Sequence, residues 1–340
     1  MVHLEKSALL VLALAGLGLA AAPARATTMY VESVNAGSDA VFRYDVQPGR
    51  APVYLDTITA GLGDPREMVL RASTGELFIE NAEAGSGGSI SGFLAPPANG
   101  TYVGSNFATG GSTAPHGLAI RGDELFVSTN NGGDVLRYTI DAGGGLHANG
   151  AISNVYASGA HGRGEAIDAN GNLWVAVQSA SNSLEKVVEY AFDAGGAASL
   201  VRALGPSDGV DGPSEVAIDP ITGDLFIANS RANDVLRVRF DAGGQAVVDA
   251  PITGLSNPGG LAFAPWGELF VADYGTDRYL RYTFGAGGAA TLSGQFTQPS
   301  GHPGYILFGS ELPAVPEPGA MALALLGGLA AFARRRRPGA

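Results

Sequence analysis

One short apolar pattern recurs along most of the chain: a Leu or Met, then an aromatic residue, then a β-branched residue. Successive copies begin 44 to 52 residues apart, which is within the range of propeller blades and longer than leucine-rich or ankyrin repeats. Each copy is short and apolar, as expected of a buried strand. The copies are Met29-Tyr30-Val31, Leu77-Phe78-Ile79, Leu125-Phe126-Val127, Leu173-Trp174-Val175, Leu225-Phe226-Ile227 and Leu269-Phe270-Val271.

The residues around each copy repeat as well. A small apolar strand precedes it, as at residues 215–218, and a Gly/Asp turn joins the two. A polar loop then leads to an alternating strand, which predicts a half-buried strand with its arginine on the solvent face, at Arg137, Arg237 and Arg281. That strand ends in a Gly-rich hairpin turn such as Asp-Ala-Gly-Gly, and a weaker fourth strand follows. Four strands in each of six units predict an all-β chain folded as a six-bladed β-propeller.

The two ends of the repeat array predict how the ring closes. The first unit starts directly at its second strand, residues 29–31. The missing opening strand appears after the sixth unit, where residues 302–308 match residues 257–263. We therefore expect residues 302–308 to form the innermost strand of a blade whose other strands come from about residues 29–60. Closure of this kind removes the exposed edge that an open array would leave.

The first 26 residues have the order of a secretory signal. Lys6 provides a positive start, residues 8–22 form an apolar run, and Ala24 and Ala26 fit the small-x-small cleavage pattern. This order predicts a signal helix that directs export by the Sec machinery, with cleavage just before Thr27. The alternative is a retained N-terminal anchor.

The last residues contain three signals in order: a Pro-Glu-Pro segment, an uncharged apolar run at residues 320–333, and a basic end. Four arginines are costly to move across a bilayer, so they should stay cytoplasmic. At about 1.5 Å per residue the run spans roughly 21 Å, short of a hydrocarbon core of about 30 Å. It therefore suits a transmembrane helix that is handed to a processing enzyme. The residues of the motif are Val315, Pro316, Glu317, Pro318, Arg334, Arg335, Arg336 and Arg337.

This tail resembles the PEP-CTERM sorting signal of Gram-negative bacteria. The resemblance implies recognition by an exosortase, a membrane protease-transferase, after a transient stay in the inner membrane. The protein would then reach the cell envelope or the extracellular matrix. The expected division of the chain is a signal peptide at 1–26, a propeller at 27–310, a linker with the Pro-Glu-Pro motif at 311–319, a transmembrane sorting segment at 320–333 and a basic cytoplasmic end at 334–340.

Composition narrows the possible partners. The net charge is −12, and removal of the predicted ends makes the chain more acidic, because six of its 20 basic residues lie there. Such a charge argues against binding nucleic acid or anionic lipid. It is compatible with simple solubility outside the cell, or with cation-bridged contact to an acidic polysaccharide. The absence of cysteine excludes disulfides, a thiolate metal site and a cysteine nucleophile.

The blade consensus resembles those of NHL-repeat and gluconolactonase-like six-bladed propellers. The likeness is carried by units such as residues 212–219, Gly-Pro-Ser-Glu-Val-Ala-Ile-Asp, followed by residues 224–229, Asp-Leu-Phe-Ile-Ala-Asn. It implies the fold, whereas propellers of this kind include binding proteins, lactonases and other hydrolases.

The turns that lead into the inner strands should gather at one mouth of the central channel, the default ligand site. Their side chains either bind a metal or an anionic sugar, or cap the strands and solvate the channel. The resemblance to gluconolactonases implies a divalent cation such as calcium, with Glu67, Glu215, Asn257 and Asp273 as the analogous oxygen ligands. The candidate channel-mouth residues are Glu67, His116, His161, Arg163, Glu215, Asn257, Asp273 and His302.

Nothing among these residues reproduces a zinc-protease motif, since the chain has no His-Glu-x-x-His sequence. The leading hypothesis is an exported, non-enzymatic propeller without a resident cofactor, acting as a binding or structural module linked to extracellular polysaccharide. The alternative is an exported metal-dependent lactonase or esterase that uses the channel mouth.

Overall fold

The computed structural model describes residues 27–34, 39–82, 88–93, 106–108, 114–130, 132–157, 159–180 and 184–309. The predicted signal helix, with Ala24 and Ala26, and the whole C-terminal tail with its sorting motif lie outside these residues. Among the described residues, no helix is long and apolar enough to cross a membrane.

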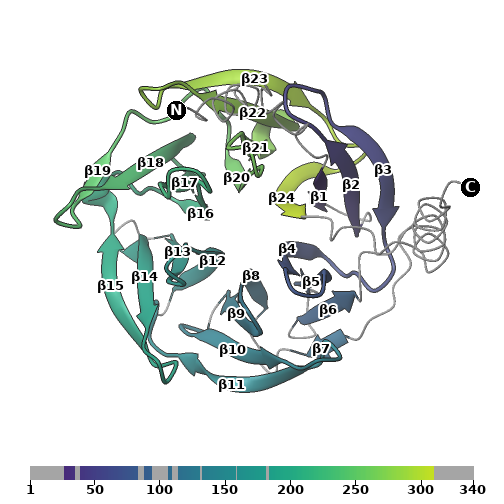
Figure 1. Ribbon diagram of the computed structural model, residues 1–340, viewed down its shortest axis with the longest axis vertical. Helices are drawn as coiled ribbons and strands as arrows, with labels where there is room; N and C mark the ends of the chain where they lie inside the picture. Colours follow the sequence, from purple (N-terminus) through teal and green to yellow (C-terminus); the bar gives the residue numbers. More distant parts are fainter. Residues whose placement is uncertain are drawn as a thin grey trace, which may run out of the picture.

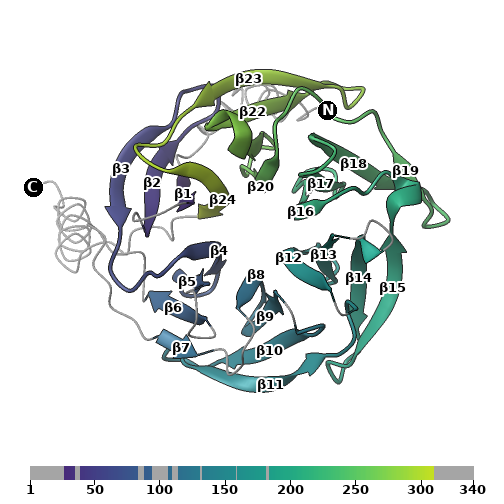
Figure 2. The same ribbon diagram turned by 180° about the vertical axis from the view of Figure 1, so that it is seen from behind.

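Across the described residues, the strands form six four-stranded antiparallel sheets arranged as blades around a central axis (Figure 1). Figure 2 shows the same ring from behind. The predicted six-bladed propeller is therefore confirmed.

The blades use consecutive strands, except where the ring closes. From the inside outward, blade 1 contains β24 (His302–Gly309), β1 (Thr27–Val34), β2 (Ala40–Val46) and β3 (Val53–Ile58); blade 2 contains β4 (Pro65–Arg71), β5 (Glu76–Asn81), β6 (Ser89–Phe93) and β7 (Asn106–Ala108); and blade 3 contains β8 (Pro115–Arg121), β9 (Glu124–Thr129), β10 (Val135–Ile140) and β11 (Leu146–Ile152).

The other three blades follow the same order. Blade 4 contains β12 (Ala160–Ile167), β13 (Leu173–Ser179), β14 (Lys186–Phe192) and β15 (Ala198–Leu204); blade 5 contains β16 (Pro213–Ile218), β17 (Leu225–Asn229), β18 (Asp234–Phe240) and β19 (Ala246–Val248); and blade 6 contains β20 (Pro258–Phe263), β21 (Leu269–Asp273), β22 (Arg278–Phe284) and β23 (Ala290–Phe296). Two short 3-10 helices, η2 (Pro206–Asp208) and η3 (Tyr274–Thr276), lie in connections.

Blade 1 closes the ring. β24 pairs antiparallel with β1, with Phe308 opposite Met29 and Ile306 opposite Val31. The Thr27 hydroxyl also donates to the Gly309 carbonyl oxygen, which joins the first described residue to the last. The prediction that residues 302–308 form the inner strand of a blade begun near residue 29 is confirmed.

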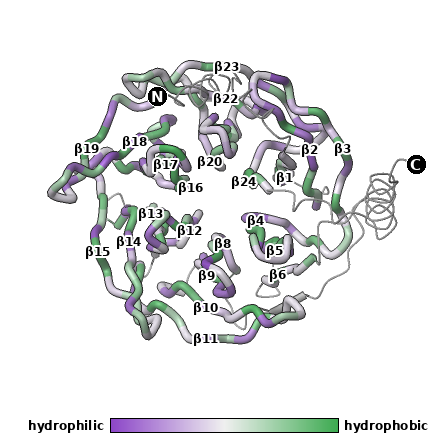
Figure 3. The backbone as a smooth tube through the Cα atoms, viewed as in Figure 1, coloured by the Kyte–Doolittle hydropathy of each residue, from purple (hydrophilic) through white to green (hydrophobic). Residues whose placement is uncertain are grey.

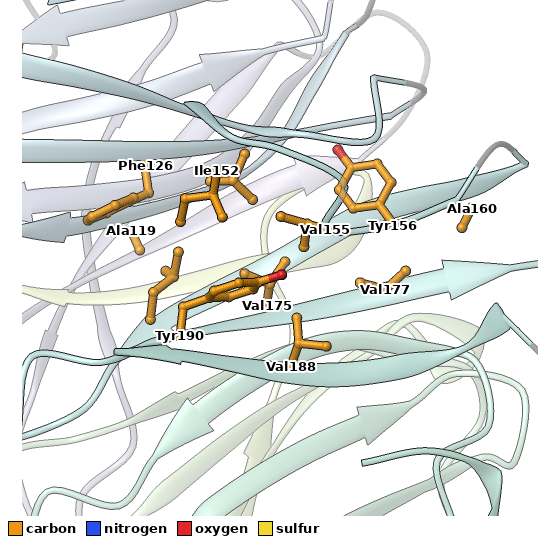
Figure 4. Close-up of a cluster of buried hydrophobic side chains, with 12 residues drawn as sticks. Ala119, Phe126, Ile152, Val155, Tyr156, Ala160, Val175, Val177, Val188 and Tyr190 are labelled. Atoms are coloured by element: carbon orange, nitrogen blue, oxygen red, sulfur yellow. The ribbon is translucent and has the colours of Figure 1, made fainter. Parts of the chain in front are cut away.

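The hydrophobic core is divided among the boundaries between neighbouring blades. In the described part of the chain, six buried clusters each combine residues of two adjacent blades. Figure 3 accordingly shows hydrophobic residues in every blade of the ring. In the cluster drawn in Figure 4, Phe126 of blade 3 packs with Val175 and Tyr190 of blade 4. Leu125 and Val127 point the other way and pack toward blade 2, because successive side chains of a strand face opposite sides.

The arginines of the alternating third strands lie between blades, where Arg281 is buried and the side chains of Arg137 and Arg237 are 13% exposed, so the prediction that they lie on the solvent face is wrong. Arg237 Nε donates to Asp224 Oδ2 at 2.8 Å, and Arg237 Nη1 donates to the Gly288 carbonyl oxygen of blade 6 at 3.0 Å. Its guanidinium carbon also lies 5.8 Å from the centre of the Phe284 ring. The alternation itself is correct. The polar side of the strand is covered by the turn of the next blade, which an alternating pattern does not reveal.

Two other blades repeat this contact. Arg137 Nη1 donates to the Gly196 carbonyl oxygen of blade 4 at 2.8 Å, and Arg281 Nη1 donates to the Arg50 carbonyl oxygen of blade 1. Each guanidinium therefore joins one blade to the next.

Gly-rich turns present the carbonyl acceptors of Arg137 and Arg237, at Gly196 and Gly288. In the turn of blade 5, Asp241 Oδ1 accepts hydrogen bonds from the backbone N–H groups of Gly243 at 2.8 Å and Gln245 at 2.9 Å. Gly244 has a φ of 78°, a left-handed conformation that glycine adopts without a steric penalty. The prediction that these segments are hairpin turns is confirmed.

Blade 4 makes the same contact with the charges exchanged. Its third strand carries Glu189 where β10, β18 and β22 carry arginine, and Arg202 of its fourth strand pairs with that carboxylate. Arg202 Nη1 then donates to the Gly244 carbonyl oxygen at 2.9 Å. Blade 4 therefore keeps an arginine-to-carbonyl hydrogen bond to the next blade, although its third strand carries a glutamate in place of the arginine.

Candidate functional site

The inner strands are irregular at the end where they enter the channel. The pairing register shifts between Pro65 and Met68 in β4 and between Gly162 and Glu165 in β12, and β8, β16 and β20 shift in the same region. A β-bulge adds a residue to one strand and re-aims its side chains. Polar side chains that are close in sequence can therefore share the channel instead of alternating strictly between its wall and its interior.

Three glutamates from three blades meet at a cavity in the channel. Glu67 of β4, Glu165 of β12 and Glu215 of β16 line a cavity of about 350 Å³ and are only 3–7% exposed. The remaining wall is apolar and includes Leu118 and Ile306. The cavity continues from the carboxyl groups toward the far ends of the inner strands, at Leu70, Ala72, Ile120, Ile167 and Phe308.

The three carboxyl groups differ in their partners. Glu67 Oε2 accepts a hydrogen bond from the backbone N–H of Leu118 in the next blade at 2.9 Å. Glu215 Oε1 accepts one from the backbone N–H of Val216 at 2.9 Å. Among the described residues, neither carboxyl oxygen of Glu165 has a partner at hydrogen-bond distance, and the nearby Ser128 only partly opposes the rise in its pKa. Because a buried charge without partners is costly, this group favours its protonated form or a ligand.

Burial and mutual repulsion keep protons on this cluster. Burial, with the nearby carboxylates of Glu215 and Glu165, raises the pKa of Glu67 well above its usual value. Burial, with Glu80 and Glu215, does the same to the pKa of Glu165, and burial raises the pKa of Glu215. Carboxyl groups of this kind can donate as well as accept hydrogen bonds, and they become anionic when a cation approaches.

A layer of polar side chains lies next to the carboxyl groups, toward the N-terminal ends of the inner strands. Arg163 of blade 4 donates to Nε2 of His116 in blade 3, and the Tyr305 hydroxyl of blade 1 lies 3.5 Å from His116 Nδ1. Burial and the Arg163 guanidinium lower the pKa of His116 well below its usual range. The imidazole is therefore neutral, which allows one of its ring nitrogens to accept the arginine N–H.

Glu32 and Glu80 are site residues that the sequence reasoning missed. Both are fully buried in second strands, and burial raises the pKa of Glu32 to about 8 and the pKa of Glu80 well above its usual value. Glu32 Oε2 accepts from the Tyr305 backbone N–H at 3.0 Å, whereas both Glu80 oxygens lack a partner. A signal was available, because the residue after the Leu-aromatic-Val pattern is small in the other units: Ser128, Ala176, Ala228 and Ala272.

Two of the predicted mouth histidines are hydrogen-bonded elsewhere, although His161 is near enough to His116 to lower its pKa. His161 Nδ1 is hydrogen-bonded to the Asn130 carbonyl oxygen. His302 pairs with Asp277, and its ring packs against Tyr274 with 4.7 Å between ring centroids. Of the histidines proposed for the mouth, His116 alone joins the glutamates, through Arg163.

The four residues proposed as calcium ligands take part in different local contacts. Glu67 and Glu215 are close enough for each to influence the other's titration. Asp273 instead accepts from the Ser256 backbone N–H at 2.6 Å, and the backbone N–H of Asn257 donates to Asn233 Oδ1 at 2.7 Å. Among the described residues, no three His, Asp or Glu side chains are grouped in a way that could hold a metal ion. The calcium site therefore stays a prediction.

One motif that the sequence reasoning passed over is Gly-Pro-Ser-Asp-Gly at residues 205–209, which has the spacing of a hydrolase nucleophile elbow. Such an elbow needs a strand, a sharp turn and a helix, with the serine exposed at the top of a sheet. Here Ser207 lies in the three-residue 3-10 helix η2 between β15 and β16. Its hydroxyl faces Asp208 Oδ2 at 3.5 Å. The segment is a connecting turn and lacks the elbow's architecture.

Comparison with known proteins gives two results for the chain. The model of the PEP-CTERM protein-sorting motif matches residues 314–337, so the predicted sorting motif is confirmed and implies processing by an exosortase. No curated protein matches the chain.

Solved structures resemble the propeller at low sequence identity. A candidate 6-phosphogluconolactonase from Bacteroides fragilis is 16% identical with a TM-score of 0.64, over 84% of this chain and 98% of that one. The periplasmic gluconolactonase PpgL from Pseudomonas aeruginosa is 17% identical with a TM-score of 0.62, over 85% and 88%. A chain of the nidogen/laminin complex is 11% identical with a TM-score of 0.63, over 85% and 100%.

At these identities the similarity supports the fold alone. The protein is thus a six-bladed β-propeller that carries a PEP-CTERM protein-sorting motif at residues 314–337.

Proposed function

We propose that this protein is an exported propeller of the Gram-negative cell envelope or extracellular matrix, which an exosortase processes and which binds acidic polysaccharide at its channel mouth. The sorting motif supports the export and the processing. The closing strand ends at Gly309, five residues before the motif begins at residue 314. Cleavage in the Pro-Glu-Pro segment would therefore release or transfer the ring with its closing strand intact.

The observation that carries the binding role is the state of Arg163. This guanidinium is partly buried in the channel layer, where its hydrogen-bond partner is the neutral His116, and its Nε atom has no partner. Among the described residues it forms no ion pair with a carboxylate. A planar guanidinium with free N–H groups suits the carboxylate of an acidic sugar, because the two can form paired hydrogen bonds.

Aromatic and imidazole rings at the same end of the channel add a second support. Tyr274 and His302 pack together where β24 begins, and flat rings offer surface to the apolar faces of a sugar. The net negative charge of the domain opposes the approach of an acidic polymer. Local contacts with arginine and bridging cations would therefore have to hold the polymer.

Two experiments test the two parts of this proposal. Replacement of Pro316, Glu317 and Pro318 by alanine should leave an unprocessed chain in the membrane fraction, as should deletion of the host's exosortase. Retention on an immobilised acidic exopolysaccharide should fall at least tenfold in Arg163→Ala, whereas Arg278→Ala, which changes an exposed arginine of β22, should bind like the wild type. Processing that continues without the exosortase, or equal retention of both variants, would reject the corresponding part.

The alternative, a metal-dependent lactonase or esterase, has support in the names of two similar structures and in the carboxyl, imidazole and phenol groups of the channel. It predicts hydrolysis of gluconolactone that rises with added calcium and is lost in Glu67→Gln and Glu215→Gln. The binding proposal predicts no turnover in any of these samples.

A further inference from the structure

The cavity beyond the polar layer has two chemically different ends. One end carries the carboxyl groups of Glu67, Glu165 and Glu215, and the rest of the wall is built from aliphatic and aromatic side chains of all six inner strands. None of the polar-layer residues His116, Arg163 and Tyr305 lines it. The cavity is therefore separate from the mouth at which we place polysaccharide.

Glu165 is the residue that points to a ligand. It is 5% exposed, it lines the cavity, and neither of its carboxyl oxygens has a hydrogen-bond partner. The Ser128 hydroxyl and backbone N–H lie near enough to Glu165 to oppose the rise in its pKa, and the hydroxyl donates to the Arg163 carbonyl oxygen at 2.8 Å. Equivalent positions in the other inner strands are apolar, because the residue paired with the β-branched position of the next strand is Met68, Leu118, Val216, Leu261 or Ile306. Blade 4 thus places a carboxyl group where packing alone would favour an aliphatic residue.

We propose that this cavity binds a small organic ammonium compound, with its N–H donors on Glu165 and the neighbouring Glu67 and Glu215 and its aliphatic part against the apolar wall. This inference goes beyond the proposed function and concerns another part of the channel.

The donor and charge inventory favours an ammonium group. An ammonium carries three donors and one positive charge, and hydrogen bonds from it to carboxylates are charge-assisted. It would give partners to the oxygens of Glu165 and would offset the repulsion among three buried carboxyl groups. The net charge of −12 also raises the local concentration of cations around the protein.

The volume and the apolar wall of the cavity determine which non-polar part of a ligand would fit. A volume of about 350 Å³ is near the lower end of small-molecule sites, roughly 300–1,000 Å³. The wall beyond the glutamates offers Leu118, Leu261 and Ile306, which cannot pair with the hydroxyl groups of a sugar. A short aliphatic chain fits this wall better than a polyol does.

The test uses the full chain in a non-ionic detergent at about pH 8, above the ordinary pKa of a glutamate carboxyl group, about 4.3. The probes are n-butylammonium chloride, butan-1-ol and calcium chloride, followed by calorimetry and by the melting temperature. We expect one n-butylammonium ion to bind per chain and to raise the melting temperature, and butan-1-ol to do neither. Glu165→Gln should weaken ammonium binding at least tenfold.

Two further variants keep the result decisive. Glu215→Gln should weaken n-butylammonium binding to the same extent. If one of the two glutamate variants fails to fold, the other still tests the proposal. Asp45→Asn removes one charge from β2, outside the channel, and should bind n-butylammonium like the wild type. Equal binding of alcohol and ammonium, unchanged affinity in the folded glutamate variants, or a response to calcium alone would each overturn the proposal. None of these outcomes affects sorting or polysaccharide retention, which are measured separately.

Discussion

The carboxyl group of Glu215 lies directly against Gly164 in the inner strand of the neighbouring blade. A Cβ atom on Gly164 would come within 2.1 Å of Glu215 Oε1, a distance that real atoms do not tolerate. The absence of a side chain at residue 164 is what allows a carboxyl group of blade 5 to occupy the channel beside blade 4. The two residues occupy equivalent positions in adjacent repeats, so one repeat supplies the side chain and the next supplies the space.

Gly164→Ala should therefore displace the Glu215 carboxyl group and destabilise the propeller. Because the clashing atoms are the end of a flexible side chain beside a cavity, we expect the loss to lie at the lower end of the about 1–3 kcal/mol that is typical of overpacking. Thermal unfolding of the variant measures this loss. Gly287→Ala is the matched control, because nothing lies within 4 Å of a Cβ at that glycine. Equal melting temperatures for the two variants would contradict the contact.

The interblade arginines should contribute more to the stability of the fold than their alternating sequence pattern suggests. Arg237→Ala leaves the mostly buried Asp224 unpaired and removes the bond to Gly288, so we expect a loss of about 3 kcal/mol in the free energy of unfolding. The control is Arg239→Ala, two residues along the same strand, whose exposed pair with Asp249 should contribute little. Chemical denaturation of both variants checks the difference, and similar midpoints would show that the interblade contact is weak.

Ring closure predicts that the stability of the propeller depends sharply on where the chain is truncated. A chain that ends after residue 299 lacks β24, which leaves β1 paired on its β2 side alone and the channel without one wall. It should lose cooperative unfolding, whereas a chain that ends after residue 314 should melt like the full protein. Circular dichroism during heating distinguishes the two, and an unchanged transition in the shorter chain would refute closure by this strand.

The buried carboxyl groups predict a stability that falls as the pH rises. The pKa of Glu32 in the folded state, about 8, lies above its ordinary value of 4.5, so the proton favours the folded state. Its contribution is fully present below about pH 4.5 and is lost as the pH rises through 8. Glu67, Glu80, Glu165 and Glu215 act in the same direction.

The melting temperature should therefore decline between about pH 5 and pH 8, and Glu32→Gln should make this decline shallower. His116 works in the opposite sense, because its lowered pKa means that stability is lost as the pH falls below its usual 6.5. A melting temperature that climbs steadily to pH 8 would show that the carboxyl groups are not buried in the protonated form.

Some features of the site could be foreseen from the sequence, and others could not. Glu67, His116, Arg163 and Glu215 were expected near the channel because all four lie where the chain enters an inner strand, and a repeat places these entry segments around one axis. The role of Glu165 could not be foreseen in detail, since the bulge in β12 shifts the register at that residue. A strict alternation of side chains, on which sequence reasoning relies, fails at such a bulge.

The sequence by itself determined the number of blades, the closing strand and the sorting tail. These follow from local patterns: the period of an apolar triplet, a missing strand at one end that reappears at the other, and a tripartite motif. Only the tertiary structure decided that the next blade covers Arg237, that His302 stays apart from the glutamates, and that Glu165 lines a cavity. Burial and pairing depend on what the neighbouring blade places against a residue, and that contact has no fixed distance in the sequence.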